Sequence, residues 1–396
     1  MFILTAYVLI ARYDGIIGPV AERYIARGIE KAEREKADAF ILMLDTPGGY
    51  DEAMRGIVKK ILSSKVPVIV YVYPSGGRAA SAGVFICMAA HKVAMAPGTN
   101  IGAAHPVSIG KEVSEEMKEK ITNDACAYLR SIMEKRGRDA SWAEEAVVHS
   151  SSLTEKEALE RGIIDWVCED LDDLLEKAGL QDKERIEFPL TMRERFLSRL
   201  ANPNIAYILF IIGFYGILFE VTHPGAIVPG VVGSISLILA FFAFQTLPIN
   251  YAGLLLIVMG IVMFILEAIT PTNGPLTIGG IVSMVLGSVM LINTDAPFLK
   301  ISWGVIIAAV ATTAAFFIFA VGMGLRALKR KPVSGTQGLV GEEGEARTNI
   351  DKKGGTVFVH GELWDAWADE KIKKGEAVIV VEVKGLKLKV KRKEVS

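Results

Sequence analysis

The residue of this sequence best suited to covalent chemistry is a serine in a glycine-rich run. Ser81 lies in the run GGRAASAG, residues 76–83. A serine hydroxyl is a poor nucleophile until a base takes its proton and backbone donors stabilise the oxyanion. An apolar helix is expected over Ser81–Ala90, and its N-terminus favours developing negative charge. Ser81 is therefore a candidate nucleophile, and a helix N-cap is the alternative.

A second glycine-rich turn could supply the oxyanion donors. Gly48 and Gly49 follow a run of apolar residues, and glycine allows the backbone to turn its N–H groups inward. Ala82, directly after the serine, offers an unobstructed backbone N–H. Strand ends and helix starts meet at one edge of a parallel sheet. We therefore expect Gly48, Gly49 and Ala82 to bind the oxyanion and the substrate beside Ser81.

Strand and helix patterns alternate around these turns. The expected elements are a strand at Ala6–Arg12, a helix at Val20–Glu35, a strand at Ala37–Leu44, a helix at Asp51–Leu62, a strand at Val66–Val72 and the helix at Ser81–Ala90. Such alternation predicts an α/β domain with a mostly parallel sheet covered on both faces. The apolar Met1–Ile10 has no basic region or cleavage site, so it fits a first strand better than a signal peptide.

The middle of the chain has the composition of a membrane domain. Residues 205–325 carry four charged side chains, those of Glu220, Glu267, Asp295 and Lys300. We expect five spans, at Ile205–Phe219, Val228–Leu247, Tyr251–Ile269, Ile278–Ile292 and Ile301–Leu325, with four as the alternative. The first and fourth are short for a core of about 30 Å. A basic, partly amphipathic stretch, Arg193–Arg199, precedes the first span.

A weak internal repeat lies within this membrane part. Glu220 and Glu267 each end a span and precede a Pro/Gly connector. Glycines in the following spans would let helices approach closely. We expect both carboxylates to be solvated at the membrane interface rather than to act inside it.

Charges and glycines define the two ends of the membrane part. The basic cluster at 326–331 places the end of the last span in the cytoplasm of the cell. Short strands with glycine turns then predict a small β-barrel of the OB type, at 338–341, Thr356–His360, Ile372–Gly375, Ala377–Val383 and Leu386–Val390. Trp364 and Trp367 are expected in its core, with a ligand-stacking platform as the alternative.

Composition excludes several classes of function. The net charge is −1 and the only basic stripe is the final strand, so nucleic acid is not an expected partner. The cysteines Cys87, Cys126 and Cys168 form neither a metal-ligand spacing nor a disulfide framework, and we expect buried free thiols. We predict no metal and no cofactor.

Residues 6–180 resemble the ClpP/crotonase superfamily, and within it the membrane-bound Ser-Lys proteases of the long NfeD family. The matching stretches are LDTPGG (44–49), KVPVIV (65–70), YVYP (71–74), AASAG (79–83), AMAPGTNIGA (94–103), KITN (120–123) and GIID (162–165). The order of parts is also similar: a protease domain over residues 1–185, a transmembrane domain over 200–330 and an NfeD-type OB domain over 336–396.

The resemblance implies Lys120 as the base for Ser81, because these proteases carry their catalytic lysine just before Ile-Thr-Asn. His105 is the rival, near the place of the triad histidine of soluble ClpP, and Lys118 and Lys111 have no motif behind them. In ClpP the triad acid lies just upstream of a segment that matches LTEKEA (153–158), and here that position is Ser150. A triad without its acid is incomplete, which favours a Ser81–Lys120 dyad.

A lysine that serves as a base must be neutral, which requires desolvation. We expect apolar surroundings for Lys120 from four nearby residues, Val113, Met117, Ile121 and Ala125. Arg78, Tyr50 and Asp45 flank the site. Asp45 is interpreted as turn chemistry and Asp165 as the end of a strand.

The resemblance further implies a serine endopeptidase that cleaves at apolar residues in membrane-associated, stomatin-like substrates, works at least as a dimer and resides in the cell membrane as a multi-pass protein. Two rivals remain. One is an acyl-CoA enzyme of the crotonase type, which would use paired carboxylates. The other is a non-catalytic scaffold for stomatin-like proteins.

Overall fold

The structure is a computed structural model, and it describes residues 6–107, 114–222, 225, 227–245, 247–270, 274–294, 296, 299–328 and 336–393. Its residues form two compact units. The first contains residues 1–264 and 275–314, and the second contains residues 265–274 and 315–396.

The N-terminal part of the first unit is an α/β domain, as predicted. Its main sheet has six parallel strands in the order β8-β5-β3-β2-β1-β9. These strands are β1 (Tyr7–Asp14), β2 (Ala39–Asp45), β3 (Val68–Val72), β5 (Lys92–Met95), β8 (Trp166–Val167) and β9 (Glu184–Phe188). A small second sheet joins β4 (Arg78–Ala80), β6 (Asn100–Gly102) and β7 (Ser152–Thr154).

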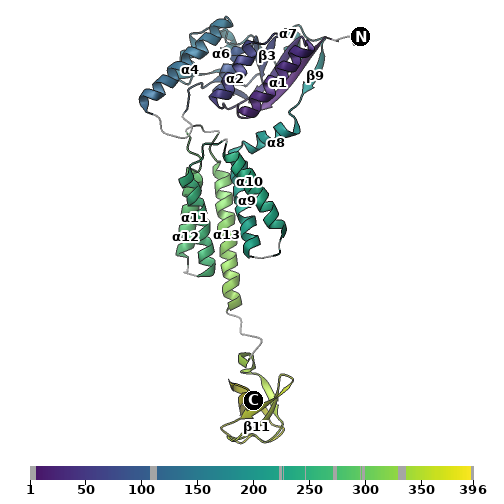
Figure 1. Ribbon diagram of the computed structural model, residues 1–396, viewed down its shortest axis with the longest axis vertical. Coiled ribbons are helices and arrows are strands. Elements are labelled where there is room, and N and C mark those ends of the chain that lie inside the picture. Colours follow the sequence, from purple (N-terminus) through teal and green to yellow (C-terminus); the bar gives the residue numbers. More distant parts are fainter. Residues whose placement is uncertain are drawn as a thin grey trace. The chain divides into compact units, whose positions relative to one another are not determined.

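Helices cover both faces of the main sheet (Figure 1). On one face lie α1 (Pro19–Glu35), α2 (Asp51–Leu62), α3 (Ala82–Ala89) and α4 (Glu115–Lys135), and on the other lies α7 (Leu171–Lys177). Shorter helices α5 (Trp142–Val148) and α6 (Glu155–Glu160) complete the domain, and α8 (Met192–Leu200) follows β9. Strand β2 is buried on both faces, which explains its continuous apolar run.

Alternation of side chains along the strands assigns them to two cores. Leu9, Phe40 and Leu42 face α1 and α2, while Ile10 and Ile41 face α7. Gly28 lets α1 approach the sheet closely, because a Cβ there would lie 2.7 Å from the Phe40 ring. The predicted boundaries agree with these elements to within two residues at most ends.

The apolar middle of the chain forms helices α9 (Pro203–Thr222), α10 (Ile227–Phe244), α11 (Tyr251–Ile269), α12 (Pro275–Met290) and α13 (Trp303–Leu328). By length and hydropathy, the described stretches 203–221 and 227–244 could cross a membrane, and three apolar stretches of 10–17 residues follow, at 251–267, 275–290 and 303–319. The first span, predicted to be short, is among the two longer ones because its helix begins at Pro203.

Glycines bring neighbouring helices together, as the repeat suggested. A Cβ on Gly216 of α9 would lie 2.7 Å from Cα of Gly233 on α10. A Cβ on Gly260 of α11 would lie 2.8 Å from the carbonyl oxygen of Gly280 on α12. The expectation of solvated carboxylates is wrong for Glu267, which is buried in the protein and accepts a hydrogen bond of 3.0 Å from the Gly274 N–H.

The C-terminal residues form a closed five-stranded barrel, β10-β11-β12-β14-β13, as predicted for an OB-type domain. Its strands are β10 (Glu343–Ala346), β11 (Gly355–Val359), β12 (Glu362–Trp367), β13 (Ala377–Lys384) and β14 (Lys387–Arg392). Two predicted strands are wrong: residues 336–339 are a 3-10 helix, and Ile372 makes only an isolated bridge.

The tryptophans of the barrel divide between two environments. Trp364 packs against the core, as expected, whereas Trp367 lies under the ammonium groups of Lys384 and Lys389. In the last strand Leu388 and Val390 are buried, whereas Leu386, just before the strand, is 81% exposed.

Candidate active site

Ser81 lies at a strained turn between β4 and α3. Its backbone has φ 52° and ψ −112°, which side-chain-bearing residues rarely adopt. Such strain costs on the order of 1–3 kcal/mol and is concentrated at functional sites. A strand-to-helix turn with a strained serine presents the hydroxyl outward, as in the nucleophile elbow of other hydrolases.

The side chain of Ser81 does not cap the helix that it precedes. No hydrogen bond joins its hydroxyl to the N-terminal N–H groups of α3. Its backbone N–H donates instead to the Gly102 carbonyl at 3.0 Å, which fixes the turn against β6. Ser81 therefore occupies the N-cap position of α3 without a side-chain capping bond, and its hydroxyl has no partner among the described residues.

The glycine turn at 48–49 lies directly beside this serine. The Thr46 N–H donates to the Arg78 carbonyl at 2.8 Å, and the Thr46 carbonyl accepts from the Ala80 N–H at 3.0 Å. This parallel bridge pairs Thr46 with Ala79, so Gly48 and Ser81 each lie two residues beyond it. The first sheet and the β4–β6 sheet are thus joined at the site.

Only glycine fits the second position of that turn. A Cβ on Gly49 would lie 2.0 Å from the Ile17 carbonyl oxygen. Gly48 has φ 128°, in the region that favours glycine, and its N–H donates to the Thr46 hydroxyl at 3.1 Å. Thr46 is fully buried and was not identified from the sequence, because its role depends on this contact.

Two backbone N–H groups near Ser81 are available as donors. The hydrogen bonds of the described residues give no acceptor to the N–H of Gly49 or of Ala82. Gly48 differs, because its N–H is already bonded to Thr46. Free backbone donors beside a nucleophile are what an oxyanion hole requires.

Lys120 lies on the exposed N-terminal half of α4. Its side chain is 66% exposed, and its ammonium pairs with Glu116 at 2.8 Å. Met117 and Ile121 are 45% and 41% exposed, and Ala125 is buried. Val113 lies outside the described residues. In this state the expected apolar surroundings of Lys120 are not assembled, and its nearest partner is Glu116.

The rival bases have their own partners. Nδ1 of His105 lies 2.8 Å from the Val147 carbonyl oxygen, and no carboxylate among the described residues pairs with this imidazole. Lys118 pairs with Glu115 at 2.8 Å, and Lys111 lies outside the described residues. Ser150 is exposed with φ 53°, so the place of a triad acid is occupied by a turn residue.

Asp45, which flanks the site, and Asp165, which directly precedes β8, have structural roles. Oδ1 of Asp45 accepts the Arg78 N–H at 2.9 Å. Asp165 accepts from Lys92, from the Val93 N–H and from Arg138. Burial alone would raise the pKa of Asp165, but these three donors outweigh it and hold that pKa below its ordinary value.

A hollow of about 840 Å³ lies beside the Gly76–Arg78 turn, lined by mostly polar residues that include Asp14, Asp45 and Thr99. Burial, and then the charge of Asp45, raise the pKa of Asp14. Ser81 does not line this hollow. This polar hollow is therefore not a binding site for apolar side chains next to Ser81.

An arginine that the sequence analysis did not identify connects α2 to the helix of Lys120. Arg55, on α2, bonds Asp51 at 2.8 Å and Asp124 of α4 at 2.5 Å. Its guanidinium also lies 4.4 Å from the centre of the Tyr128 ring. Asp124 is one helical turn after Lys120, so Arg55 sets the position of that part of α4.

The described residues contain no group of three potential metal ligands of the His, Cys, Asp or Glu type. All three cysteines are free and buried, as predicted. Burial raises the pKa of Cys87 to about 12, so this thiol is not a nucleophile.

Three family models match successive parts of the chain. The chain matches the NfeD1b N-terminal domain over residues 14–187, the NfeD integral membrane domain over 204–323 and the NfeD-like C-terminal, partner-binding domain over 336–392.

Two relatives match this chain over much of its length. Membrane-bound protease PH1510 of Pyrococcus horikoshii is 37% identical over 412 residues, which cover 97% of this chain and 93% of that protein. Membrane protein NfeD1b of Bacillus subtilis is 28% identical over 262 residues, 63% of this chain and 59% of that protein.

Among solved structures, the 1510-N membrane protease from Pyrococcus horikoshii, described as specific for a stomatin homolog, is 35% identical with a TM-score of 0.43 and covers 49% of this chain and 98% of its own. A lysine-to-alanine variant of 1510-N in complex with a substrate peptide is 35% identical with a TM-score of 0.45, covering 50% of this chain and 98% of its own. The chain therefore belongs to the NfeD family of membrane-bound proteases.

Proposed function

We propose that Ser81 is the nucleophile and Lys120 the general base of a Ser-Lys endopeptidase. The observation that carries this proposal is the backbone of Ser81, strained at φ 52° and ψ −112° with an uncommitted hydroxyl beside the Gly48–Gly49 turn. Strain of this kind has no structural use if the serine only starts a helix.

In the proposed reaction, neutral Lys120 takes the proton from the Ser81 Oγ as this oxygen attacks the scissile carbonyl carbon. The new C–O bond places negative charge on the carbonyl oxygen, which the N–H groups of Gly49 and Ala82 stabilise. Lys120 then protonates the leaving nitrogen as the C–N bond breaks. A water molecule, deprotonated by the same lysine, hydrolyses the acyl-enzyme and regenerates Ser81.

This mechanism requires Lys120 to exchange Glu116 for Ser81. The N-terminal half of α4 is exposed on every side, including at Met117 and Ile121. We infer that this half is covered when a substrate or a second copy of the chain packs on it, which would desolvate the lysine. Catalytic contacts are often loose before substrate binds.

The proposed substrate is a membrane-associated, stomatin-like protein, cleaved at apolar residues. Support comes from the 1510-N protease, which is described as specific for a stomatin homolog. The C-terminal barrel is proposed to hold such a partner, because it matches a partner-binding domain. A non-catalytic scaffold remains the second candidate, favoured by the pairing of Lys120 with Glu116 rather than with Ser81.

We further propose a multi-pass protein with a cytoplasmic barrel and three domains, over residues 1–185, 200–330 and 336–396. Five spans would put the protease domain and the barrel on opposite sides of the membrane, and four would put them on the same side. Single cysteines at the exposed positions Glu30 and Glu370 would report each side to a membrane-impermeant thiol reagent.

Casein cleavage by the reconstituted full chain tests the catalytic proposal. We expect Ser81→Ala and Lys120→Ala to lose cleavage, while Lys118→Ala, on the same exposed helical turn and also paired with a glutamate, keeps it. Retained cleavage in both Ser81→Ala and Lys120→Ala would contradict the dyad. Absence of cleavage by the unmodified chain would favour the scaffold.

A further inference from the structure

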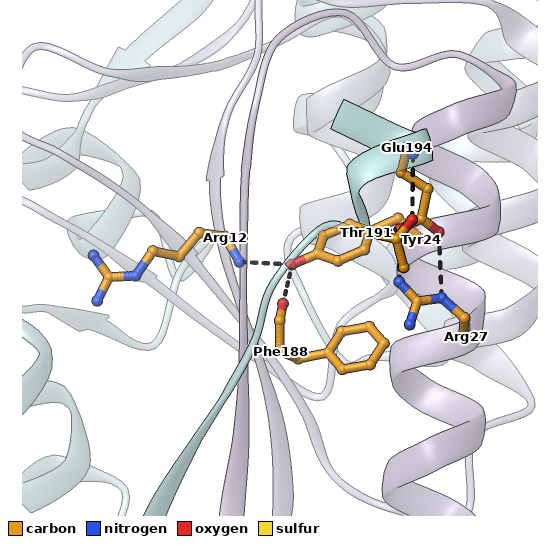
Figure 2. A network of polar contacts seen from close by, with 6 residues as sticks. All are labelled: Arg12, Tyr24, Arg27, Phe188, Thr191 and Glu194. Atoms are coloured by element: carbon orange, nitrogen blue, oxygen red, sulfur yellow. Dashed lines mark hydrogen bonds and ion pairs between the residues drawn. The ribbon is translucent and has the colours of Figure 1, made fainter. Parts of the chain in front are cut away.

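Helix α8 is a short amphipathic helix between the protease fold and the first apolar helix. Its inward side is held on α1 by the polar network in Figure 2. Arg27 of α1 forms two bonds with Glu194, of 3.2 and 2.7 Å. Glu194 also accepts from the N–H and the hydroxyl of Thr191, at 2.8 and 2.9 Å, which closes a capping box at the start of α8.

Strand β9, which leads into α8, is also bonded to α1. The Tyr24 hydroxyl donates to the Phe188 carbonyl and accepts the Arg12 N–H at 3.2 Å, so it joins α1, β1 and β9 (Figure 2). The Tyr24 and Phe188 rings are stacked, with centroids 5.4 Å apart, and the Arg27 guanidinium lies 4.3 Å from the Phe188 ring centre. These contacts fix which side of α8 faces the protein.

The opposite side of α8 is apolar and basic. Met192 and Phe196, one helical turn apart, are 79% and 51% exposed. Arg195 and Arg199 lie on the same side, at the spacing i, i+3, i+4 and i+7 from Met192. With Arg193 they make three exposed guanidinium groups, none of which has an ion pair among the residues that the structure describes.

The chain itself keeps this outer face near the membrane. Two residues, Ala201 and Asn202, separate the end of α8 from Pro203, where α9 begins. A connection of this length spans about 10 Å at most. The headgroup layer on each side of the hydrocarbon core is of similar order, about 5–8 Å thick. A helix tied so closely to a membrane helix must lie at the surface of the bilayer.

We propose that the outer face of α8 binds anionic phospholipid headgroups, with Met192 and Phe196 inserted at the headgroup boundary and Arg193, Arg195 and Arg199 on the phosphates. Uncompensated guanidinium groups beside exposed apolar side chains are the composition of a helix that lies in the membrane interface. The ion pair between Arg27 and Glu194 holds α8 on α1. Lipid binding by α8 therefore sets how the protease domain is held against the membrane.

Lipid-headgroup quenching on the full chain tests this proposal. The native cysteines are buried, so a bimane label can be placed selectively on a Phe196→Cys variant. The protein is reconstituted in phosphatidylcholine vesicles, with or without phosphatidylglycerol, that contain a headgroup nitroxide lipid. We expect strong quenching that increases with phosphatidylglycerol, and no quenching for a label at Leu159, which is 43% exposed on α6.

Charge reversal separates lipid binding from general electrostatics. In the Phe196→Cys background, Arg195→Glu with Arg199→Glu should abolish the increase caused by phosphatidylglycerol. The control Lys65→Glu with Lys156→Glu makes the same change in net charge at exposed sites outside α8. It should leave the increase in quenching with phosphatidylglycerol unchanged. The proposal is overturned if the label at 196 is unquenched in both lipids. A label shielded from aqueous iodide yet unquenched by lipid would also overturn it, and would assign the face to another protein surface.

Discussion

The carbonyl of Thr46 accepts a 3.0 Å hydrogen bond from the N–H of Ala80, the residue before Ser81. This contact ties the end of β2 to the end of β4, two segments that are separate in the sequence. It places the Gly48–Gly49 turn beside the serine, and every donor proposed for the oxyanion depends on it.

Replacing Gly49 by alanine should abolish most proteolysis. The new Cβ would meet the Ile17 carbonyl at 2.0 Å, so the turn must move and its N–H must leave the oxyanion. Loss of one such donor lowers kcat by about 100-fold or more. The measurement is kcat for casein cleavage. Gly18→Ala is the control, because its Cβ would lie at an ordinary 3.6 Å from Tyr50, and it should remain active.

Removing Arg55 should slow the reaction more than it destabilises the fold. The side chain is 36% exposed, so its ion pairs contribute only about 1 kcal/mol or less to folding. It positions α4 one turn from Lys120, however, and a small displacement there should lower kcat about tenfold with little change in KM. Arg130→Ala, which removes a 3.8 Å pair with Glu144 from the same helix, is the matched control. Equal losses in both variants would contradict a positioning role.

Acid should release α8 from α1. Burial would raise the pKa of Glu194, but the donors of Thr191 and Arg27 outweigh burial and lower it. A lowered folded-state pKa gives stability that is complete above the unfolded-state value, near 4.5, and is lost as pH falls through the folded-state value. The protection factors for hydrogen exchange of residues 188–200, which correct for the intrinsic pH dependence of exchange, should therefore decrease below about pH 4.5.

Glu194→Gln is the control for this titration. It removes the charge, so exchange in this segment should already be faster at neutral pH and should vary less with acid. An acid dependence identical to that of the unmodified chain would show that another group controls the docking of α8.

The native thiols should resist modification until the protein unfolds. Burial raises the pKa of Cys87 to about 12 and that of Cys168 to about 11, and thiolate is the reactive form. Titration with a thiol reagent at pH 8 should detect no thiol in the folded chain and three after denaturation. Rapid reaction of any thiol before denaturation would contradict the burial described here.

Local patterns predicted most of the elements that hold the site. The buried apolar run of β2 and the helical spacing of α2 are properties of short segments. Helix α2 was predicted to its exact ends, Asp51–Leu62. β12 was missed because Glu362 and Leu363 are exposed, which leaves no clear alternation. The bridge of Thr46 to Ala79 could only be expected in general terms, because pairing between distant segments is set by the whole sheet.

The position of Lys120 illustrates the other limit of sequence patterns. The motif around it predicts a role, but the rotamer and the partner depend on what covers the exposed half of α4. Glu116, four residues earlier on the same helix, is an available partner at helical spacing. Likewise, Arg55 could not be linked to Asp124 before α2 and α4 were placed side by side.

The most direct test of the central claim is covalent labelling of the reconstituted chain with a fluorophosphonate, followed by mass spectrometry of the modified peptide. We predict one adduct, on the Oγ of Ser81, that is absent in Ser81→Ala, strongly slowed in Lys120→Ala and unchanged in Lys118→Ala. An adduct on another residue, or labelling that persists in Ser81→Ala, would contradict the assignment of Ser81 as the nucleophile.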